Sequence, residues 1–370
     1  MDPAKKKLDL SKLRIYPLRD RQHLSYVNDI IIHPGDTLLP ISDSHLQQIY
    51  AIEKKLRKAR DKGASAVLIY GAHLIKNGLA VLVNELIEAG WLTHIATNGA
   101  GSIHDWELAH LGASAESVER GVAKGTFGAW NETAKNIHLA ILTGALDSLG
   151  YGQSLGRFIC ENGCTLPKES ELVEAIIRQP ANQLTAARAD LLYIMRQLSL
   201  MSGPIDVVHP YRKTSILASA WLHNVPFTVH PSIGYDIIAN HPIFSGSAIG
   251  RAGEWDFKLF GGSLEDLDGG VTLSVGSAIM GPQVFEKALN CVNNIKIEKG
   301  GCPVTDHSIY VVDIQDGGQW DWKHGEPPKT NPAYYLRFCK SYSRMGGQME
   351  YIQCDNTTFI QHLHRILIDQ

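Results

Sequence analysis

Short, continuously apolar runs alternate along most of this chain with stretches in which apolar residues have helical spacing. The run ASAVLIYGA at 64–72 contains Gly71 near its end and is typical of a strand buried on both faces of a parallel sheet. A helical pattern follows over 78–90, and a second strand pattern covers 92–101. Together these three segments predict a βαβ unit.

The same alternation continues to the end of the chain. Further strands are predicted at 205–210, 225–232, 270–277, 307–315 and 349–355. Helices are predicted at 129–148, 167–178, 184–201, 213–224, 282–292, 332–345 and 356–368. Because strands alternate with helices, we expect an α/β fold with a doubly wound, mostly parallel sheet of about seven strands and helices on both faces.

The alternation begins only after residue 63. The preceding segment ends in a helical pattern at 47–63 that closes at Gly63, an ordinary helix end. No low-complexity linker separates the later strands from one another. We therefore predict an N-terminal helical extension at 1–63 and a single large domain at 64–370.

Charge and composition narrow the classes of function. A net charge of −3 and a pI near 6.6 give no electrostatic reason to expect a nucleic-acid partner. No segment reaches the roughly 18 consecutive apolar residues that a membrane-spanning helix needs, and the N-terminus lacks the apolar stretch of a secretory signal. These features predict a cytoplasmic protein without a membrane partner.

The six cysteines favour free thiols over a disulfide scaffold in a chain of 370 residues. Cys160 and Cys164 lie close together, but a zinc site would need a second pair of ligands at suitable spacing. The other cysteines are scattered singly, so we expect no metal.

Four predicted strand ends carry small or polar residues, at 71–73, 97–102, 230–234 and 275–278. In an open parallel sheet, ligands bind just beyond the carboxyl ends of the strands, and glycine lets the backbone approach a phosphate closely. The four strand ends therefore predict a nucleotide-like ligand. The run TNGAGS matches neither the GxGxxG fingerprint nor a P-loop.

Charged residues near these strand ends are the candidates for chemistry. His104 follows the TNGAGS run, while Asp105 and Asp236 could serve a ligand or could be acidic residues favoured at a helix N-terminus. Lys340 could be reactive or could be an ordinary surface lysine. Asp355 suits both ligand binding and the N-cap of the last predicted helix.

The order of these motifs resembles the deoxyhypusine synthase family. The similar segments are VLIYGAHLIKNGLAVLVNELIEAGWLTHIATNGAGSIHD, NVPFTVHPSIGYDII, VTLSVGSAIMGPQVFEKALN, LRFCKSYSR and MEYIQCDNTTFI. The resemblance covers about residues 64–368 and is weakest at 150–210 and 240–270.

The resemblance implies a homotetrameric, NAD-dependent transferase that oxidises a polyamine or small amine. In that family a lysine attacks the resulting imine, and the aminoalkyl group then passes to an acceptor amine. By resemblance, Lys340 is the nucleophile, and Asp236, His104 and Phe338 contact the amine substrate. Cofactor contacts are implied at Ala72, His73, Thr97, Asn98, Gly99, Gly101, Gly276, Ser277 and Asp355.

The chain departs from the family pattern at several of these positions. Phe338 and Cys339 stand where the family has Trp and Gly before its lysine, and Ile103 and His104 stand where it has two glutamates. Because a dicationic substrate needs carboxylates to balance its charges, these departures weaken the case for spermidine and favour a small amine over a protein lysine as the acceptor. Two alternatives remain: a nucleotide-binding protein without transferase activity, and an NAD-dependent amine oxidoreductase that releases its imine to water.

Overall fold

The computed structural model describes residues 8–368 and contains a six-stranded sheet in which every neighbouring pair of strands is parallel. Its strands are β2 (Ala66–Tyr70), β3 (His94–Asn98), β7 (Phe227–His230), β8 (Val271–Val275), β9 (Ser308–Asp313) and β10 (Gln348–Gln353). They lie in the order β10-β9-β8-β2-β3-β7. The predicted α/β class with a doubly wound parallel sheet is confirmed.

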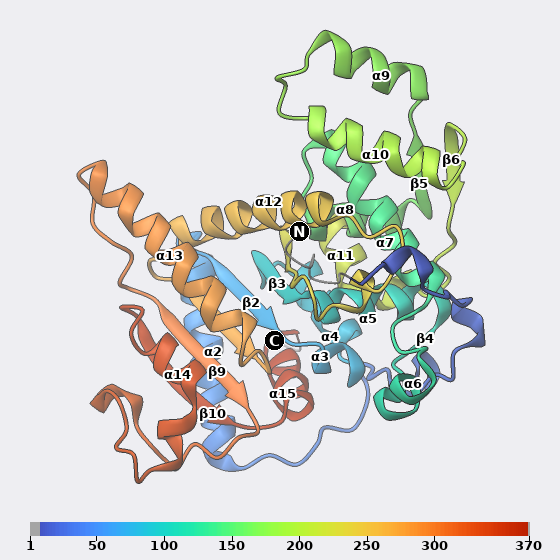
Figure 1. Ribbon diagram of the computed structural model, residues 1–370. Coiled ribbons are helices and arrows are strands. Elements are labelled where there is room, and N and C mark those ends of the chain that lie inside the picture. Colours follow the sequence, from blue (N-terminus) through green and yellow to red (C-terminus); the bar gives the residue numbers. More distant parts are fainter. Residues whose placement is uncertain (1–7, 369–370) are drawn as a thin grey trace, which may run out of the picture.

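Helices cover both faces of the sheet (Figure 1). Along β2, Val67 and Ile69 belong to one apolar cluster, while Leu68 and Tyr70 belong to the other. This alternation follows from the two-residue period of a strand, and burial on both sides explains why β2 is apolar throughout. One cluster includes α12 (Gly246–Glu265), α13 (Met280–Glu298) and α14 (Arg337–Tyr342). The other includes α2 (Asp43–Lys62), α4 (Ala80–Glu88), α5 (Gly99–Leu111), α8 (Tyr151–Cys160), α11 (Ile216–Leu222) and α15 (Asn356–Ile368).

The sheet order places a change of winding direction at its centre. Counted along the chain, β2 is the first strand of the sheet, β3 and β7 follow on one side, and β8, β9 and β10 follow on the other. This is the 3-2-1-4-5-6 order of dinucleotide-binding folds. The winding direction reverses between β2 and β8.

The main sheet has six strands because the segment predicted as a strand at 205–210 lies outside it. That segment contributes to β6 (Gly203–Asp206), which pairs antiparallel with β5 (Gly163–Leu166). Residues along β6 alternate between half-buried and exposed, which is typical of a ribbon that is open to solvent on one side.

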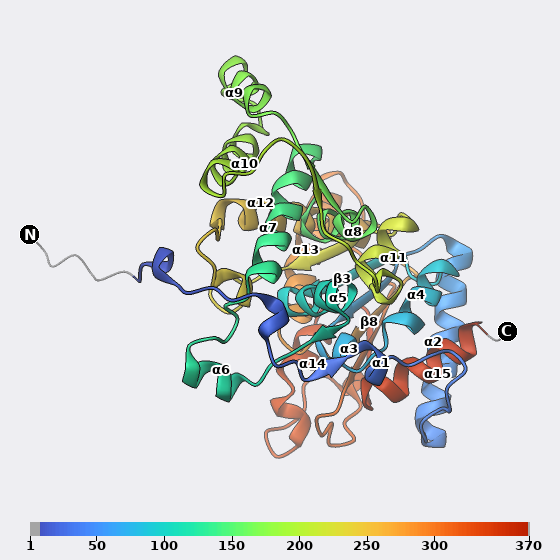
Figure 2. The ribbon, with the colours of Figure 1, turned by 90° about the vertical axis from the view of Figure 1, so that its right-hand side faces the viewer.

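Most other predicted helices are present with shifted ends. Besides those named above, they include α7 (Asn131–Gly144), α9 (Glu169–Arg178) and α10 (Thr185–Gln197). Both ribbon views show α9 and α10 standing away from the sheet (Figures 1 and 2). The shorter elements are β1 (Ser25–Tyr26), α1 (Val27–Ile30), α3 (His73–Lys76), β4 (Ala113–Ser114) and α6 (Val118–Lys124).

Helix α2 packs against α15 and against the central strands β2 and β8. The segment at 1–63 thus contributes a helix to one layer of the fold, and the division at residue 63 stays a prediction. Within residues 8–368, no helix has both the length and the apolar content needed to cross a membrane.

Candidate functional site

The ends of β2 and β8 meet very closely at the point where the winding reverses. A Cβ atom added to Gly71 would lie 2.1 Å from the carbonyl oxygen of Gly276. Gly276 itself has a φ of +60°, a backbone conformation that favours glycine. Glycine at these two positions therefore lets the backbones following β2 and β8 approach each other at the switch point.

A cavity of about 430 Å³, which we call the β8–β10 cavity, opens at the carboxyl ends of three strands. It is lined by His73, Asn77, Gly276, Val312, Asp313, Ile314, Gln315, Cys354, Asp355 and Asn356. Its volume lies within the roughly 300–1,000 Å³ of small-molecule sites. The structure thus brings together His73, Gly276 and Asp355 from the predicted cofactor contacts.

Asp355 caps helix α15. Its Oδ1 accepts hydrogen bonds from the backbone N–H groups of Thr357 and Thr358, each at 3.0 Å. The capping interpretation is confirmed, and the same residue also lines the β8–β10 cavity. Ile314, at the rim of this cavity, is 73% exposed.

A second cavity, which we call the α5 cavity, has a volume of about 250 Å³. It is lined by Arg21, Lys76, Ala100, Ile103, His104, Glu107, Ala115, Glu116, Val118, Phe127, Tyr235, Asp236 and Ile237. Helix α3 contributes to both cavities, since His73 lines the β8–β10 cavity and Lys76 lines the α5 cavity. The structure therefore brings together His104 and Asp236, two of the predicted substrate contacts, and their contact with a substrate stays a prediction.

Asp236 presents a buried carboxylate with one oxygen unused. Its Oδ2 accepts a hydrogen bond from the Ser232 backbone at 2.8 Å, whereas its Oδ1 has no partner among residues 8–368. Burial raises the pKa of Asp236 to about 6, and the hydrogen bond from Ser232 opposes that rise. An unsatisfied buried carboxylate oxygen is costly, so it favours a ligand that donates a hydrogen bond.

His104 has its tautomer fixed by a buried chain of hydrogen bonds. Glu107 accepts two hydrogen bonds from Arg21, at 2.8 and 2.7 Å, and one from the Ser114 hydroxyl at 2.6 Å. Burial acts to raise the pKa of Glu107, but the Arg21 guanidinium, together with His104 and the Ser114 hydrogen bond, outweighs it and holds that pKa below its usual range. Because the Ser114 proton goes to Glu107, the Ser114 oxygen accepts from Nδ1 of His104, at 2.7 Å.

The Nε2 atom of His104 consequently carries a lone pair. No residue in the described part of the chain donates to that atom. Burial is the main cause that lowers the pKa of His104 to about 4, so the ring is neutral. His104 therefore offers the α5 cavity a hydrogen-bond acceptor.

The TNGAGS segment is the start of a helix instead of an open turn. Asn98 caps α5 by accepting from the Gly101 backbone at 2.9 Å. A Cβ on Gly99 would lie 2.1 Å from Oδ2 of Asp236, and one on Gly101 would lie 2.1 Å from Oγ1 of Thr97. These glycines make room for neighbouring side chains.

Three further predicted cofactor contacts also have local roles. Thr97 is fully buried and donates to the Tyr70 carbonyl at 2.9 Å. Ser277 accepts from the Gly281 backbone at 3.1 Å within the start of α13. Ala72 is the N-cap residue of α3. Their contact with a cofactor stays a prediction.

Lys340 and Phe338 line neither cavity. The Lys340 ammonium lies 2.6 Å from the Glu326 carboxylate and 3.3 Å from the centre of the Tyr334 ring. Phe338 is buried and packs near the ring of Tyr351. The ammonium that the resemblance makes a nucleophile is thus held in an ion pair.

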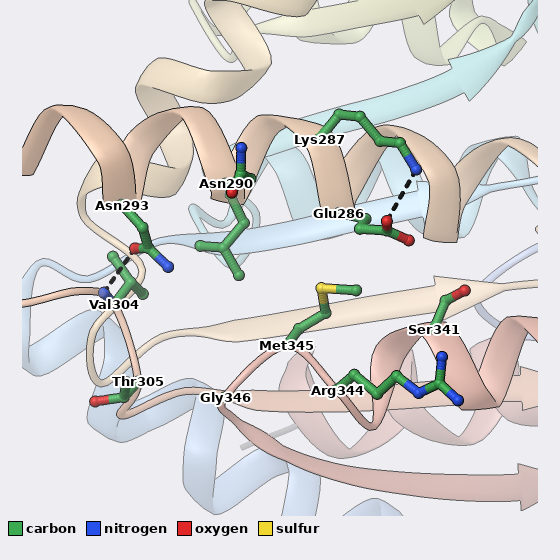
Figure 3. A pocket seen from close by; sticks show the side chains of 11 residues that line it. Glu286, Lys287, Asn290, Asn293, Val304, Thr305, Ser341, Arg344, Met345 and Gly346 are labelled. Atoms are coloured by element: carbon green, nitrogen blue, oxygen red, sulfur yellow. Dashed lines mark hydrogen bonds and ion pairs between the residues drawn. The ribbon is translucent and has the colours of Figure 1, made fainter.

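The largest of these cavities, of about 540 Å³, lies between α13 and α14 (Figure 3). Val304 and Thr305 line it just before β9, and Met345 and Gly346 line it just before β10. It therefore opens at the amino ends of these strands, opposite to the edge where parallel sheets bind ligands. We assign the functional site to the two smaller cavities.

Sequence reasoning missed Arg21, Glu107, Ser114 and Lys76. The Arg21–Glu107 pair joins residues 86 positions apart, and no local motif marks it. Among residues 8–368, no group of three or more His, Cys, Asp or Glu side chains is placed to hold a metal. All six cysteines are free thiols.

The strand order defines the class of protein as a doubly wound α/β protein, and its order is the one found in dinucleotide-binding folds. No protein-family model matches the chain, and no curated protein matches it.

Three solved structures that match the chain are distant from it in sequence. A structure of an AgrE mutant in complex with L-arginine is matched at 16% identity and a TM-score of 0.44, over 90% of this chain and 34% of that one. AgrE with ornithine and NAD⁺ is matched at 15% identity and a TM-score of 0.40, over the same shares. A conserved LOR/SDH protein from Methanococcus maripaludis S2 is matched at 14% identity and a TM-score of 0.42, over 96% of this chain and 74% of that one.

This chain thus spans about a third of the length of AgrE. Each TM-score lies below 0.5, so none of these proteins transfers a ligand or a residue role to this chain. Membership of the deoxyhypusine synthase family is wrong, because no family model matches and the matched structures named here are AgrE and a LOR/SDH protein. The polyamine substrate and the homotetramer were implied only by that resemblance, so neither is retained.

Proposed function

We propose that this protein is an NAD-dependent oxidoreductase that acts on a carbon atom bearing an amine. The observation that carries the proposal is the 3-2-1-4-5-6 strand order, with cavities on both sides of its switch point. A dinucleotide binds across that point in folds of this order. The hydrogen-bond acceptors of Asp236 and His104 in the α5 cavity favour an amine as the substrate.

The residues around the switch point fit a dinucleotide. Gly71 makes room for the Gly276 carbonyl, and the backbone of Gly276 is exposed at the β8–β10 cavity. His73, Gly276 and Asp355 would line the cofactor in the β8–β10 cavity, with Ala72 and Ser277 beside them. When bound, NAD⁺ supplies a hydride acceptor.

An amine fits the two acceptor atoms of the α5 cavity. Oδ1 of Asp236 lacks a donor, and Nε2 of His104 carries a lone pair. A protonated amine has donors only, so it satisfies both atoms. Asp236 is anionic above a pH of about 6 and then pairs with the positive charge.

The reaction follows from this placement. Asp236 would take one proton from the ammonium group, and bound NAD⁺ would supply the acceptor for a hydride from the adjacent carbon. Loss of that proton and that hydride leaves an iminium ion, which water hydrolyses to a carbonyl compound and an ammonium ion. A carboxylate with a pKa near 6 suits the task of proton acceptor close to neutral pH.

Transfer through a lysine imine is not part of the proposal. Lys340 would have to leave Glu326 and lose a proton before it could attack, and it lines neither cavity. The imine therefore reacts with water.

Turnover of the purified protein tests this function. We expect NADH and an equivalent amount of carbonyl product with NAD⁺ and a member of a panel of primary amines and amino acids. The kcat/KM should rise with pH around a value of about 6, as Asp236 ionises. Asp236→Asn should lower kcat/KM by roughly 100-fold or more and should abolish this rise with pH.

The matched control is Asp61→Asn, which changes an exposed aspartate on α2 and should leave kcat/KM unchanged. NAD⁺ binding without turnover of any panel member would instead identify a nucleotide-binding protein without this activity. If Asp236→Asn left kcat/KM unchanged, Asp236 would have no part in the reaction.

A further inference from the structure

The α5 cavity contains a cation that the proposed chemistry does not use. Lys76, on α3, is half-buried and lines the cavity together with His104 and Asp236. No carboxylate of residues 8–368 lies within 4.0 Å of its ammonium. Lys76 and Asp236 thus share one cavity without forming an ion pair.

The other charged residues of this cavity already have hydrogen-bond partners within the protein. Arg21 and Glu107 form a bidentate pair and are both buried. Glu116 accepts hydrogen bonds from the Gly128 backbone, at 3.0 Å, and from the Trp130 indole, at 2.7 Å. Both bonds to Glu116 end on Oε1, and no cation of residues 8–368 lies within 4.0 Å of its carboxylate, so the cavity offers a ligand the cation of Lys76 and the anions of Asp236 and Glu116.

The remaining wall of the cavity is apolar. Ile103 and Phe127 face it, as do Val118 and Ile237. Such a wall accepts hydrocarbon groups, while the charged residues fix the orientation of the ligand. A ligand that satisfies the whole cavity therefore carries one anionic group, one ammonium group and a short hydrocarbon part.

We propose that the α5 cavity binds an α-amino acid, with its carboxylate on Lys76 and its ammonium on Asp236 and His104. This inference rests on the proposed function and names its substrate class. The ammonium and carboxylate of an α-amino acid are attached to the same carbon, so both charges fit within one small cavity. A primary amine without a carboxylate leaves the charge of Lys76 unmatched.

The anionic oxygen that meets Lys76 could also come from a phosphate of the dinucleotide, because Lys76 is on the helix shared by both cavities. The two sources are distinguished by measuring cofactor binding and substrate binding separately. Lys76→Met removes the charge and keeps the aliphatic length of the side chain. Lys299→Met is the matched control, since Lys299 is an exposed lysine at the end of α13.

The experiment compares α-amino acids with the primary amines that lack only their carboxylate. We expect calorimetry to show that the wild-type protein binds an amino acid at least roughly tenfold more tightly than the matching amine. Lys76→Met should abolish that difference, leave the Kd for NAD⁺ unchanged and leave the weak binding of the amine unchanged. Lys299→Met should behave as wild type.

Two outcomes would overturn the inference. One is equal or tighter binding of the amine by the wild-type protein. The other is a Lys76→Met protein that loses NAD⁺ affinity and keeps its preference for the amino acid, which would assign Lys76 to a cofactor phosphate. Because binding is measured without turnover, an amino acid that binds but is not oxidised would contradict the proposed reaction and leave this inference standing.

Discussion

At the scale of single residues, Gly71 allows the backbone after β2 to lie against the backbone of Gly276. Replacement of Gly71 by Ala would put a Cβ 2.1 Å from a backbone oxygen. A backbone oxygen cannot move aside as the end of a flexible side chain can. We expect Gly71→Ala to lower the free energy of unfolding by about 1–3 kcal/mol, the usual cost of overpacking. Urea denaturation measures this change.

The matched glycine is Gly262, which is exposed on α12 and has no atom within 4 Å of an added Cβ. Gly262→Ala should raise the free energy of unfolding by about 0.5–1 kcal/mol, because alanine favours a helix. Equal effects of the two substitutions would mean that the strand ends do not meet as described.

The sequence predicted several residues of the site for reasons that the structure only partly supports. His73, Gly276 and Asp355 follow parallel strands or begin the next helix, so a regular sheet brings them together. Gly99 and Gly101 were predicted to approach a ligand, but they make room for Asp236 and Thr97. Such side-chain contacts depend on packing between distant segments, which no local pattern contains.

At the scale of elements, a buried aspartate ties α5 to α11. The two oxygens of Asp105 accept from the Ser215 hydroxyl and from the Ile216 backbone, at the start of α11. Asp105 lies within α5 instead of facing either cavity. The interpretation of Asp105 as an acidic residue at the N-terminus of its own helix is wrong. Asp105 instead accepts hydrogen bonds at the N-terminus of α11.

This contact makes stability depend on pH. Burial raises the pKa of Asp105 to about 7, with the bonds from Ser215 and Ile216 opposing the rise. The folded protein therefore keeps a proton that the unfolded chain releases, and the free energy of unfolding should fall as pH rises from about 4 to about 7. In Asp105→Asn the amide oxygen can accept from Ile216 and the amide NH2 can donate to the Ser215 hydroxyl, so this variant should flatten that fall in urea titrations. Identical profiles for variant and wild type would contradict the expectation.

The sequence predicted most elements where the apolar pattern was strong. Strands such as β2 and β8 are buried along their whole length, and most of their residues are apolar. Helix α12 was missed because its glycines, including Gly261 and Gly262, weaken the helical pattern. The segment of β6 was assigned to the wrong sheet, since a short strand pattern does not say which strand it pairs with.

At the scale of the whole molecule, the two halves of the sheet each provide one cavity beside a common helix, α3. Large apolar side chains are exposed on the loops that follow three strands: Ile233 and Tyr235 after β7, Ile279 after β8 and Ile314 after β9. Exposed apolar groups gathered at one edge favour a ligand-binding role for that edge. The central claim is that a dinucleotide binds there.

Calorimetric titration of NAD⁺ into three proteins tests this claim most directly: wild type, Ile314→Glu and Ile177→Glu. Ile314 is 73% exposed at the β8–β10 cavity, and Ile177 is 72% exposed on α9, which stands away from the sheet (Figure 1). A carboxylate at 314 should repel the diphosphate and raise the Kd at least roughly tenfold, or about 1.4 kcal/mol, while Ile177→Glu should bind as wild type does. Absence of NAD⁺ binding by the wild-type protein, or equal binding by all three proteins, would contradict the claim.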